Sequence, residues 1–166
     1  MANTYEAIAT VTVGSGGAAT ITFSSIPQTY TDLKVVMSAR SLDADTRDSI
    51  YIKPNNSTSN LSYRYIRGDG ASVTSNTLDR VDINADNATA NTFGNLEIYI
   101  PNYAGSANKS FSIDTVTEHN ATTAYAGLHA WLWADSAAIT SLVFSTLATD
   151  NFAQYSTATL YGIKNS

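Results

Sequence analysis

Hydrophobic and polar residues alternate along much of this chain, and the first clear case is segment 4–13. Apolar residues recur there at every second position from Tyr5 to Val13, and most of the residues between them are polar. A period of two is typical of a β-strand that buries one face. A glycine-rich connection over residues 14–17 follows, and it predicts a hairpin turn into a second strand.

The same strand features recur along the chain and are separated by loops rich in Asn, Ser, Asp and Gly. The segments expected to form strands are 4–13, 19–23, 33–41, 49–53, 61–67, 78–83, 96–100, 109–117, 124–133, 139–145 and 155–163. Glu, Lys and Leu, which favour helices, are scarce. Short strands at regular spacing indicate a sandwich or barrel. We therefore expect one all-β domain over residues 1–166, a jelly-roll-like antiparallel β-sandwich of about 8–11 strands.

Segment 124–133 differs from the others because both of its faces are apolar. One face carries two leucines, and the other carries His129, Trp131 and Trp133. A strand that is apolar on both faces is normally covered on both. Such a strand lies either at the centre of the domain, under an outer cover, or at a subunit interface. We favour the interface, made by His129, Trp131 and Trp133, as in a trimer of jelly-roll subunits.

Composition and charge exclude several classes of function. The 166 residues include 9 Lys and Arg against 14 Asp and Glu, a net charge of −5, so there is no basic surplus for binding nucleic acid. Cysteine is absent, which excludes disulfides and thiol chemistry. No apolar run reaches the length of a membrane span, and the first residues lack signal-peptide features. Ser and Thr make up 41 of the residues and supply a neutral, hydrogen-bonding surface.

Residues with catalytic side chains are present without a catalytic pattern. His119 and His129 are the candidate general bases, but no nucleophile-elbow motif accompanies them. Glu97 and Glu118, with Asp114 near, could flank a glycosidic bond if their strands were adjacent. Exposed or packed structural positions explain these residues more simply. We expect no catalytic residues and no enzymatic activity.

Two acidic groups raise the question of a bound cation. Residues 43–48 carry three aspartates, and Asp79, Asp82 and Asp86 form a looser group. Hard cations need several oxygen ligands, but the first group lacks EF-hand spacing and contains an arginine. We expect no metal site and no cofactor.

Several tyrosines could offer flat amphipathic rings to a sugar or to a protein partner. Tyr63, Tyr65 and Tyr103 are the candidates for such contacts. The alternative is that their rings pack in the core and their hydroxyls form internal hydrogen bonds. The sequence leaves both interpretations open and favours the second.

Three stretches, residues 22–33, 91–103 and 155–163, together resemble small virion structural proteins of marine tailed phages, especially those that infect cyanobacteria. The resemblance spans nearly the whole chain. It implies a β-sandwich module used as a capsid decoration protein, a knob or a distal part of a fibre, without a catalytic motif. Because the strand pattern begins at Thr4, we expect a compact accessory subunit without a shaft or an N-terminal anchor.

These observations lead to two hypotheses about function. The first is a non-enzymatic decoration or cement protein of the virion, which forms a homo-oligomer, most simply a trimer. It would bind the major capsid protein or other virion proteins, and neither nucleic acid nor a membrane. The alternative is a receptor-binding tip module of a tail fibre or head fibre that recognises host surface glycans.

Overall fold

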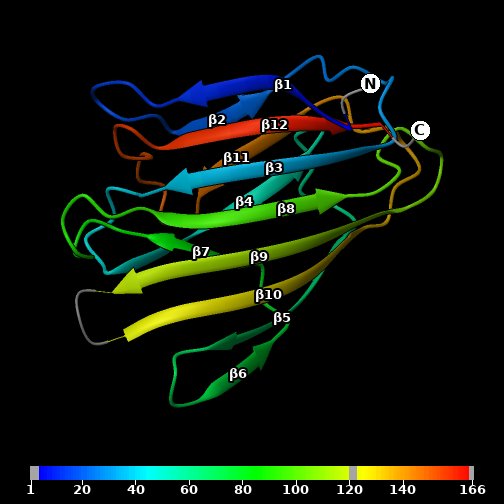
Figure 1. The fold of residues 1–166 in the computed structure, drawn as a ribbon. Helices are drawn as coiled ribbons and strands as arrows, with labels where there is room; N and C mark the ends of the chain where they lie inside the picture. Colours follow the sequence, from blue (N-terminus) through cyan, green and yellow to red (C-terminus); the bar gives the residue numbers. More distant parts are fainter. Residues whose placement is uncertain (1–3, 120–122, 165–166) are drawn as a thin grey trace.

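The computed structural model describes residues 4–119 and 123–164, and this part of the chain forms two antiparallel sheets packed face to face (Figure 1). The expected all-β antiparallel sandwich is confirmed. Across the large sheet the strands are β1 (Tyr5–Thr12), β12 (Thr157–Ile163), β3 (Asp32–Ala39), β8 (Gly94–Ile100), β9 (Lys109–His119), β10 (Thr123–Trp133), β5 (Leu61–Gly68) and β6 (Val73–Asn76). Across the small sheet they are β2 (Thr20–Phe23), β11 (Leu142–Thr146), β4 (Arg47–Pro54) and β7 (Val81–Asn84).

Every strand expected from the sequence is present, and β6 is an addition. Its four residues are all exposed and show no alternation between apolar and polar side chains, so no periodic signal marks them. The described residues thus form twelve strands, divided eight and four. A jelly roll is built from eight strands in two Greek keys, so the likeness to that fold is loose.

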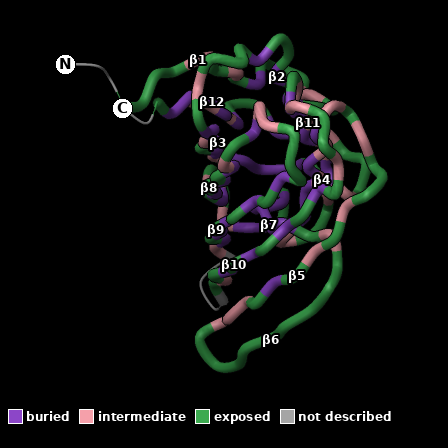
Figure 2. Tube along the Cα trace, turned by 90° about the vertical axis from the view of Figure 1, so that its right-hand side faces the viewer, coloured by how far each residue is buried: buried purple, intermediate pink, exposed green. Residues whose placement is uncertain are grey.

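The core lies between the sheets, because one face of each strand turns toward the other sheet. In β8 every second residue is buried, including Leu96, Ile98 and Ile100, and the residues between them are exposed. From the small sheet, Ile52 and Phe144 fill the same space. Figure 2 shows this buried interior as purple segments between the two layers. Within the described residues there is no helix that could cross a membrane.

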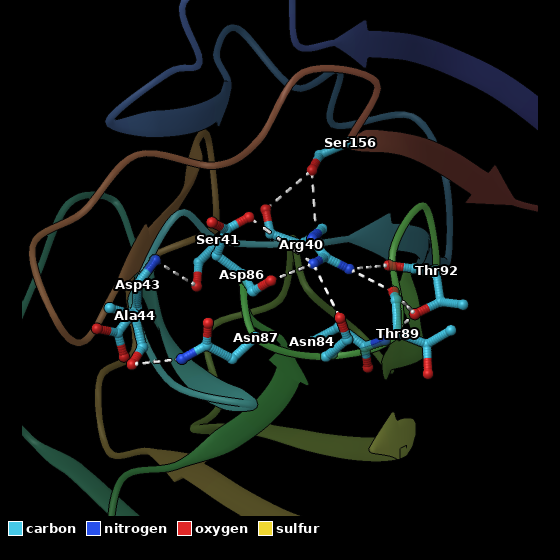
Figure 3. A network of polar contacts seen from close by, with 11 residues as sticks. Arg40, Ser41, Asp43, Ala44, Asn84, Asp86, Asn87, Thr89, Thr92 and Ser156 are labelled. Atoms are coloured by element: carbon cyan, nitrogen blue, oxygen red, sulfur yellow. Dashed lines mark hydrogen bonds and ion pairs between the residues drawn. The ribbon is translucent and has the colours of Figure 1, made fainter. Parts of the chain in front are cut away.

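A buried arginine closes one end of the sandwich (Figure 3). Arg40, directly after β3, is only 7% exposed, and its guanidinium donates hydrogen bonds into the connection between β7 and β8. The acceptors are the backbone carbonyls of Asp86, Ala88, Thr89 and Thr92, at 2.7–3.3 Å. Hydrogen bonds from a charged donor are stronger than neutral ones, so one side chain holds this whole connection in place.

The large sheet extends beyond the small one. Strand β7, at the edge of the small sheet, lies over β8 and β9. Figures 1 and 2 both show β10, β5 and β6 continuing past that edge. The residues of β10 and β5 are therefore positioned by contacts different from those of the central strands.

Candidate functional site

The structure places the three expected interface residues inside the chain. His129, Trp131 and Trp133 are 5%, 3% and 2% exposed, and they lie on the face of β10 that turns toward the interior. The expected subunit interface at these side chains therefore has no accessible surface in this structure. The strand is apolar on both faces as the sequence indicates, but the bulky face is covered by the chain itself.

Side chains of β5 contribute to the burial of this inner face. Trp131 lies directly opposite Tyr63, with ring centroids 4.6 Å apart at an interplanar angle of 72°. His129 lies directly opposite Tyr65, with centroids 5.4 Å apart. Cross-strand aromatic pairs stabilise a sheet, and here they add to the contacts that Trp131 and Trp133 make in the core between the sheets. Burial lowers the pKa of His129, and this outweighs the opposing charge of the nearby Asp82.

The three tyrosines considered for glycan contact have different surroundings. Tyr103 is fully buried, and its hydroxyl donates a hydrogen bond to the carbonyl of Pro27. Tyr65 is 7% exposed. Neither ring is available to an external ligand, which agrees with the packing interpretation. Tyr63 remains half-buried and lines a hollow together with residues of β4.

The opposite face of β10 is exposed and carries an apolar surface. We call Ile66, Val73, Val116, Leu128 and Leu132 the outer apolar patch; these side chains are 38–77% exposed. They share one face because Leu128 pairs directly with Ile66 and because Ala126, two residues before it, pairs with Val116. Two shallow hollows of about 570 and 340 Å³ lie along this part of the large sheet.

Two opposite charges flank the outer apolar patch. Arg64 lies directly opposite Ala130 on one side of β10, and Asp114 lies directly opposite Leu128 on the other side. Since neighbouring strands are about 4.8 Å apart, the two charged residues face each other diagonally across β10. Neither forms an ion pair with another described residue; Arg64 donates only to the carbonyl of Tyr63, at 2.6 Å.

Most of the rest of this outer face is polar, although Val36 and Tyr99 are also 38% and 39% exposed there. Lys34 and Glu97 form an ion pair at 2.6 Å, and Thr10 and Thr159 are joined by a hydrogen bond at 3.0 Å. The five residues of the outer apolar patch lie together at the end of the sheet formed by β9, β10, β5 and β6. An apolar surface gathered at one place and bordered by polar residues is typical of a contact site.

A buried charge cluster fixes β5 and β10 to the small sheet. Asp82 on β7 is 3% exposed; it lies 2.8 Å from Arg67 and 3.5 Å from Arg47, and it accepts a hydrogen bond from Ser49. The ring of Tyr125 lies 4.8 Å from both guanidinium carbons. Burial lowers the pKa of Arg67, but the hydrogen bond and charge of Asp82 outweigh it and raise that pKa overall. Sequence reasoning missed this cluster, because it depends on register between distant strands.

The structure brings two of the candidate catalytic carboxylates, Glu97 and Asp114, together on adjacent strands. Glu97 lies directly opposite Asp114, but on the open face and with Lys34 at 2.6 Å, as in a surface ion pair. Glu118 is four residues beyond Asp114 on β9, and His119 ends that strand. In the described ranges 4–119 and 123–164, no group of three acidic or histidine side chains is arranged to hold a metal ion.

The fold and the site define an antiparallel β-sandwich with one open, partly apolar sheet face. No protein-family model matches the chain, and neither a curated protein nor a solved structure is similar enough to count as a match. The assignment of a function therefore depends on the geometry of the surface and on the chemistry of its residues.

Proposed function

We propose that this protein is a non-enzymatic structural subunit that works through protein–protein contact on the open face of the large sheet. The observation that carries the proposal is the outer apolar patch. Single exposed apolar residues are ordinary, but five gathered on one flat face lower the free energy when another protein covers them. Burial of such surface contributes about 25 cal/mol per Å².

The partner that fits the patch is a second copy of the chain. In an isologous contact, residue i of one subunit meets residue j of the other, and the reverse contact is equivalent. Arg64 and Asp114 lie at equivalent distances on opposite sides of the middle of β10. A two-fold axis that lies above that point, parallel to the sheet and perpendicular to the line between the two residues, brings each Arg64 against the partner's Asp114. This pairs charges that have no ion-pair partner among the described residues.

This arrangement differs in symmetry from the trimer expected from the sequence. A trimer needs two different surfaces that fit each other, whereas a self-complementary patch favours pairs. The number of subunits stays a prediction. The support for self-association itself is the match between the patch and its own two-fold copy.

The setting that we propose is the shell of a tailed phage, where the protein decorates the capsid and contacts the major capsid protein or its neighbours. The support for this setting is the resemblance of residues 22–33, 91–103 and 155–163 to small virion proteins. Repetition over a symmetric shell strengthens contacts that are individually weak. A neutral surface rich in Ser and Thr is compatible with many protein contacts and does not indicate a particular reaction.

Electron cryomicroscopy of the phage particle that encodes this chain tests the setting. We expect density for the sandwich at regular positions on the capsid surface, with the outer face of β9, β10 and β5 at a contact. Density only at the tip of a tail or head fibre would contradict capsid decoration and support the receptor-binding alternative. Absence of the chain from purified particles would contradict both.

A further inference from the structure

A second candidate site lies on the other side of β5, where β4 runs past the edge strand of the small sheet. Strand β4 pairs with β7 only from Arg47 to Ile50, so Tyr51 and Lys53 have no β7 neighbour. The connection between β6 and β7 and the start of β5 border this gap. The hollow that results has a volume of about 270 Å³ and is lined mainly by Tyr51, Lys53, Thr58, Leu61, Tyr63 and Asp79.

The aromatic walls of this hollow are held in place. Tyr63 is held by its edge-on contact with Trp131, and it is half-buried where it lines the hollow beside β4. Tyr51 is also half-buried, and the ammonium group of Lys53 lies 5.8 Å from the centre of its ring. Because both rings are already ordered, a ligand that stacks on them loses little additional side-chain entropy.

Asp79 lines the hollow and carries one oxygen atom without a hydrogen-bond partner among the described residues. This atom, Oδ1, is buried. Burial raises the pKa of this carboxyl to about 6, although the neighbouring Tyr63 hydroxyl and the charge of Lys53 both act to lower it. Buried polar atoms are nearly always hydrogen-bonded, so an unpaired carboxyl oxygen at the edge of a hollow indicates a place for a donor.

The charges of the hollow define the chemistry of its ligand. Lys53 offers donors and Asp79 offers acceptors, and their opposite charges leave no net preference for an anion or a cation. Two aromatic rings suit a ligand with apolar C–H faces, and the polar groups suit several hydroxyls. A hollow of this volume has room for a single ring.

We propose that this hollow binds one pyranose ring of a neutral saccharide, with Tyr51 and Tyr63 against its C–H faces and with Asp79 and Lys53 hydrogen-bonded to its hydroxyls. The site does not overlap the outer apolar patch, because Tyr63 and Ile66 lie on opposite faces of β5. Saccharide binding is therefore independent of self-association, and each activity can fail without the other. Saccharide binding in this hollow supplies a mechanism by which a subunit on a particle surface contacts a glycan.

NMR titration of the ¹⁵N-labelled protein tests the proposal directly. The probes are the methyl glycosides of glucose, galactose and mannose, together with the free hexoses. We expect saturable shifts, with millimolar dissociation constants, for amides next to Tyr51, Lys53 and Asp79 with at least one sugar. A methyl glycoside that binds as well as its free hexose indicates a ring within a longer glycan, whereas binding of free hexoses alone indicates a soluble sugar.

Matched variants separate this site from non-specific binding. Tyr51→Ala and Asp79→Asn should each weaken binding about tenfold or more, whereas Tyr5→Ala, at an exposed tyrosine on β1, should leave it unchanged. The ¹⁵N spectrum reports whether each variant is folded; if Tyr51→Ala is not, Tyr51→Phe and Asp79→Asn give the result. Absence of saturable shifts at these amides with every sugar, or equal binding by Asp79→Asn and the wild type, would overturn the proposal.

Discussion

The two faces of β10 carry apolar residues of comparable hydrophobicity, yet one is the best-buried part of the strand and the other is exposed. Trp131 and Trp133 face inward, where β5 supplies aromatic partners, while Leu128 and Leu132 face outward and remain 55% and 38% exposed. The difference shows that the burial of a face is decided by what lies across it. The inner face is completed within the chain, and the outer face is the one on which we propose that a second molecule binds.

The strongest test of this comparison uses two adjacent residues on opposite faces. We expect Trp133→Ala to lower the free energy of unfolding by about 3–5 kcal/mol, because it leaves a cavity in the core. Leu132→Ala should cost less than about 1 kcal/mol in the monomer, since its side chain is partly in water already. Urea denaturation followed by tryptophan fluorescence or circular dichroism measures both values.

The milder change Trp133→Phe serves as the control for that experiment. The indole nitrogen of Trp133 has no hydrogen-bond partner among the described residues, so its removal should cost much less than removal of the whole ring. If Trp133→Ala and Leu132→Ala had equal effects on stability, the assignment of inner and outer faces would be contradicted.

A second pair of variants compares two arginines with opposite environments. Arg40 is buried and donates to four backbone carbonyls, and its replacement by Ala should cost about 2–4 kcal/mol because those acceptors lose their partner. Arg64 is exposed and donates only to a neighbouring carbonyl, so Arg64→Ala should change monomer stability by less than about 0.5 kcal/mol. Thermal unfolding at low protein concentration distinguishes these outcomes, and similar losses in both variants would contradict them.

The pH dependence of stability should show a smaller effect from His129. Because burial lowers its pKa, the unfolded chain takes up a proton near pH 6.5 while the folded chain does so only at lower pH. The unfolded state therefore binds more protons over this interval, and the free energy of unfolding falls as the pH falls below about 6.5.

The matched variant His129→Gln isolates this contribution. Asp48 and Asp79 have raised pKa values and act in the opposite direction, but they are present in both chains and cancel in the comparison. We expect wild-type stability to fall more than that of His129→Gln between about pH 7.5 and pH 5.5 in urea unfolding. Parallel curves would mean that His129 is protonated equally easily in the folded and unfolded chains.

Local pattern was sufficient to predict the fold class and most strands, because alternation is a property of neighbouring residues. It could not detect β6, whose residues Val73–Asn76 show no alternation and gain their strand conformation from pairing with β5. It also identified β10 as apolar on both faces, but the face that we expected at a subunit interface, with His129, Trp131 and Trp133, is buried within the chain. The burial of that face depends in part on the tyrosines of β5, which are distant in sequence.

The functional features depend even more on long-range register. The diagonal placement of Arg64 and Asp114 requires β5 and β9 to flank β10 in one particular alignment. The hollow at Tyr51 and Asp79 exists because β7 is too short to cover all of β4. No local motif encodes either arrangement, so sequence reasoning named Tyr63 as a ligand-contact candidate but missed the residues around it.

Sedimentation equilibrium of charge-reversal variants is the most direct test of the central claim, which is self-association through the outer face. We expect the wild type to associate, and Arg64→Asp or Asp114→Arg alone to weaken association by about tenfold or more, or 1.4 kcal/mol, through like-charge contacts. The double variant Arg64→Asp/Asp114→Arg should restore it, because each new charge again meets its opposite across the two-fold axis. A wild type that stays monomeric, or a double variant no better than either single one, would contradict the account.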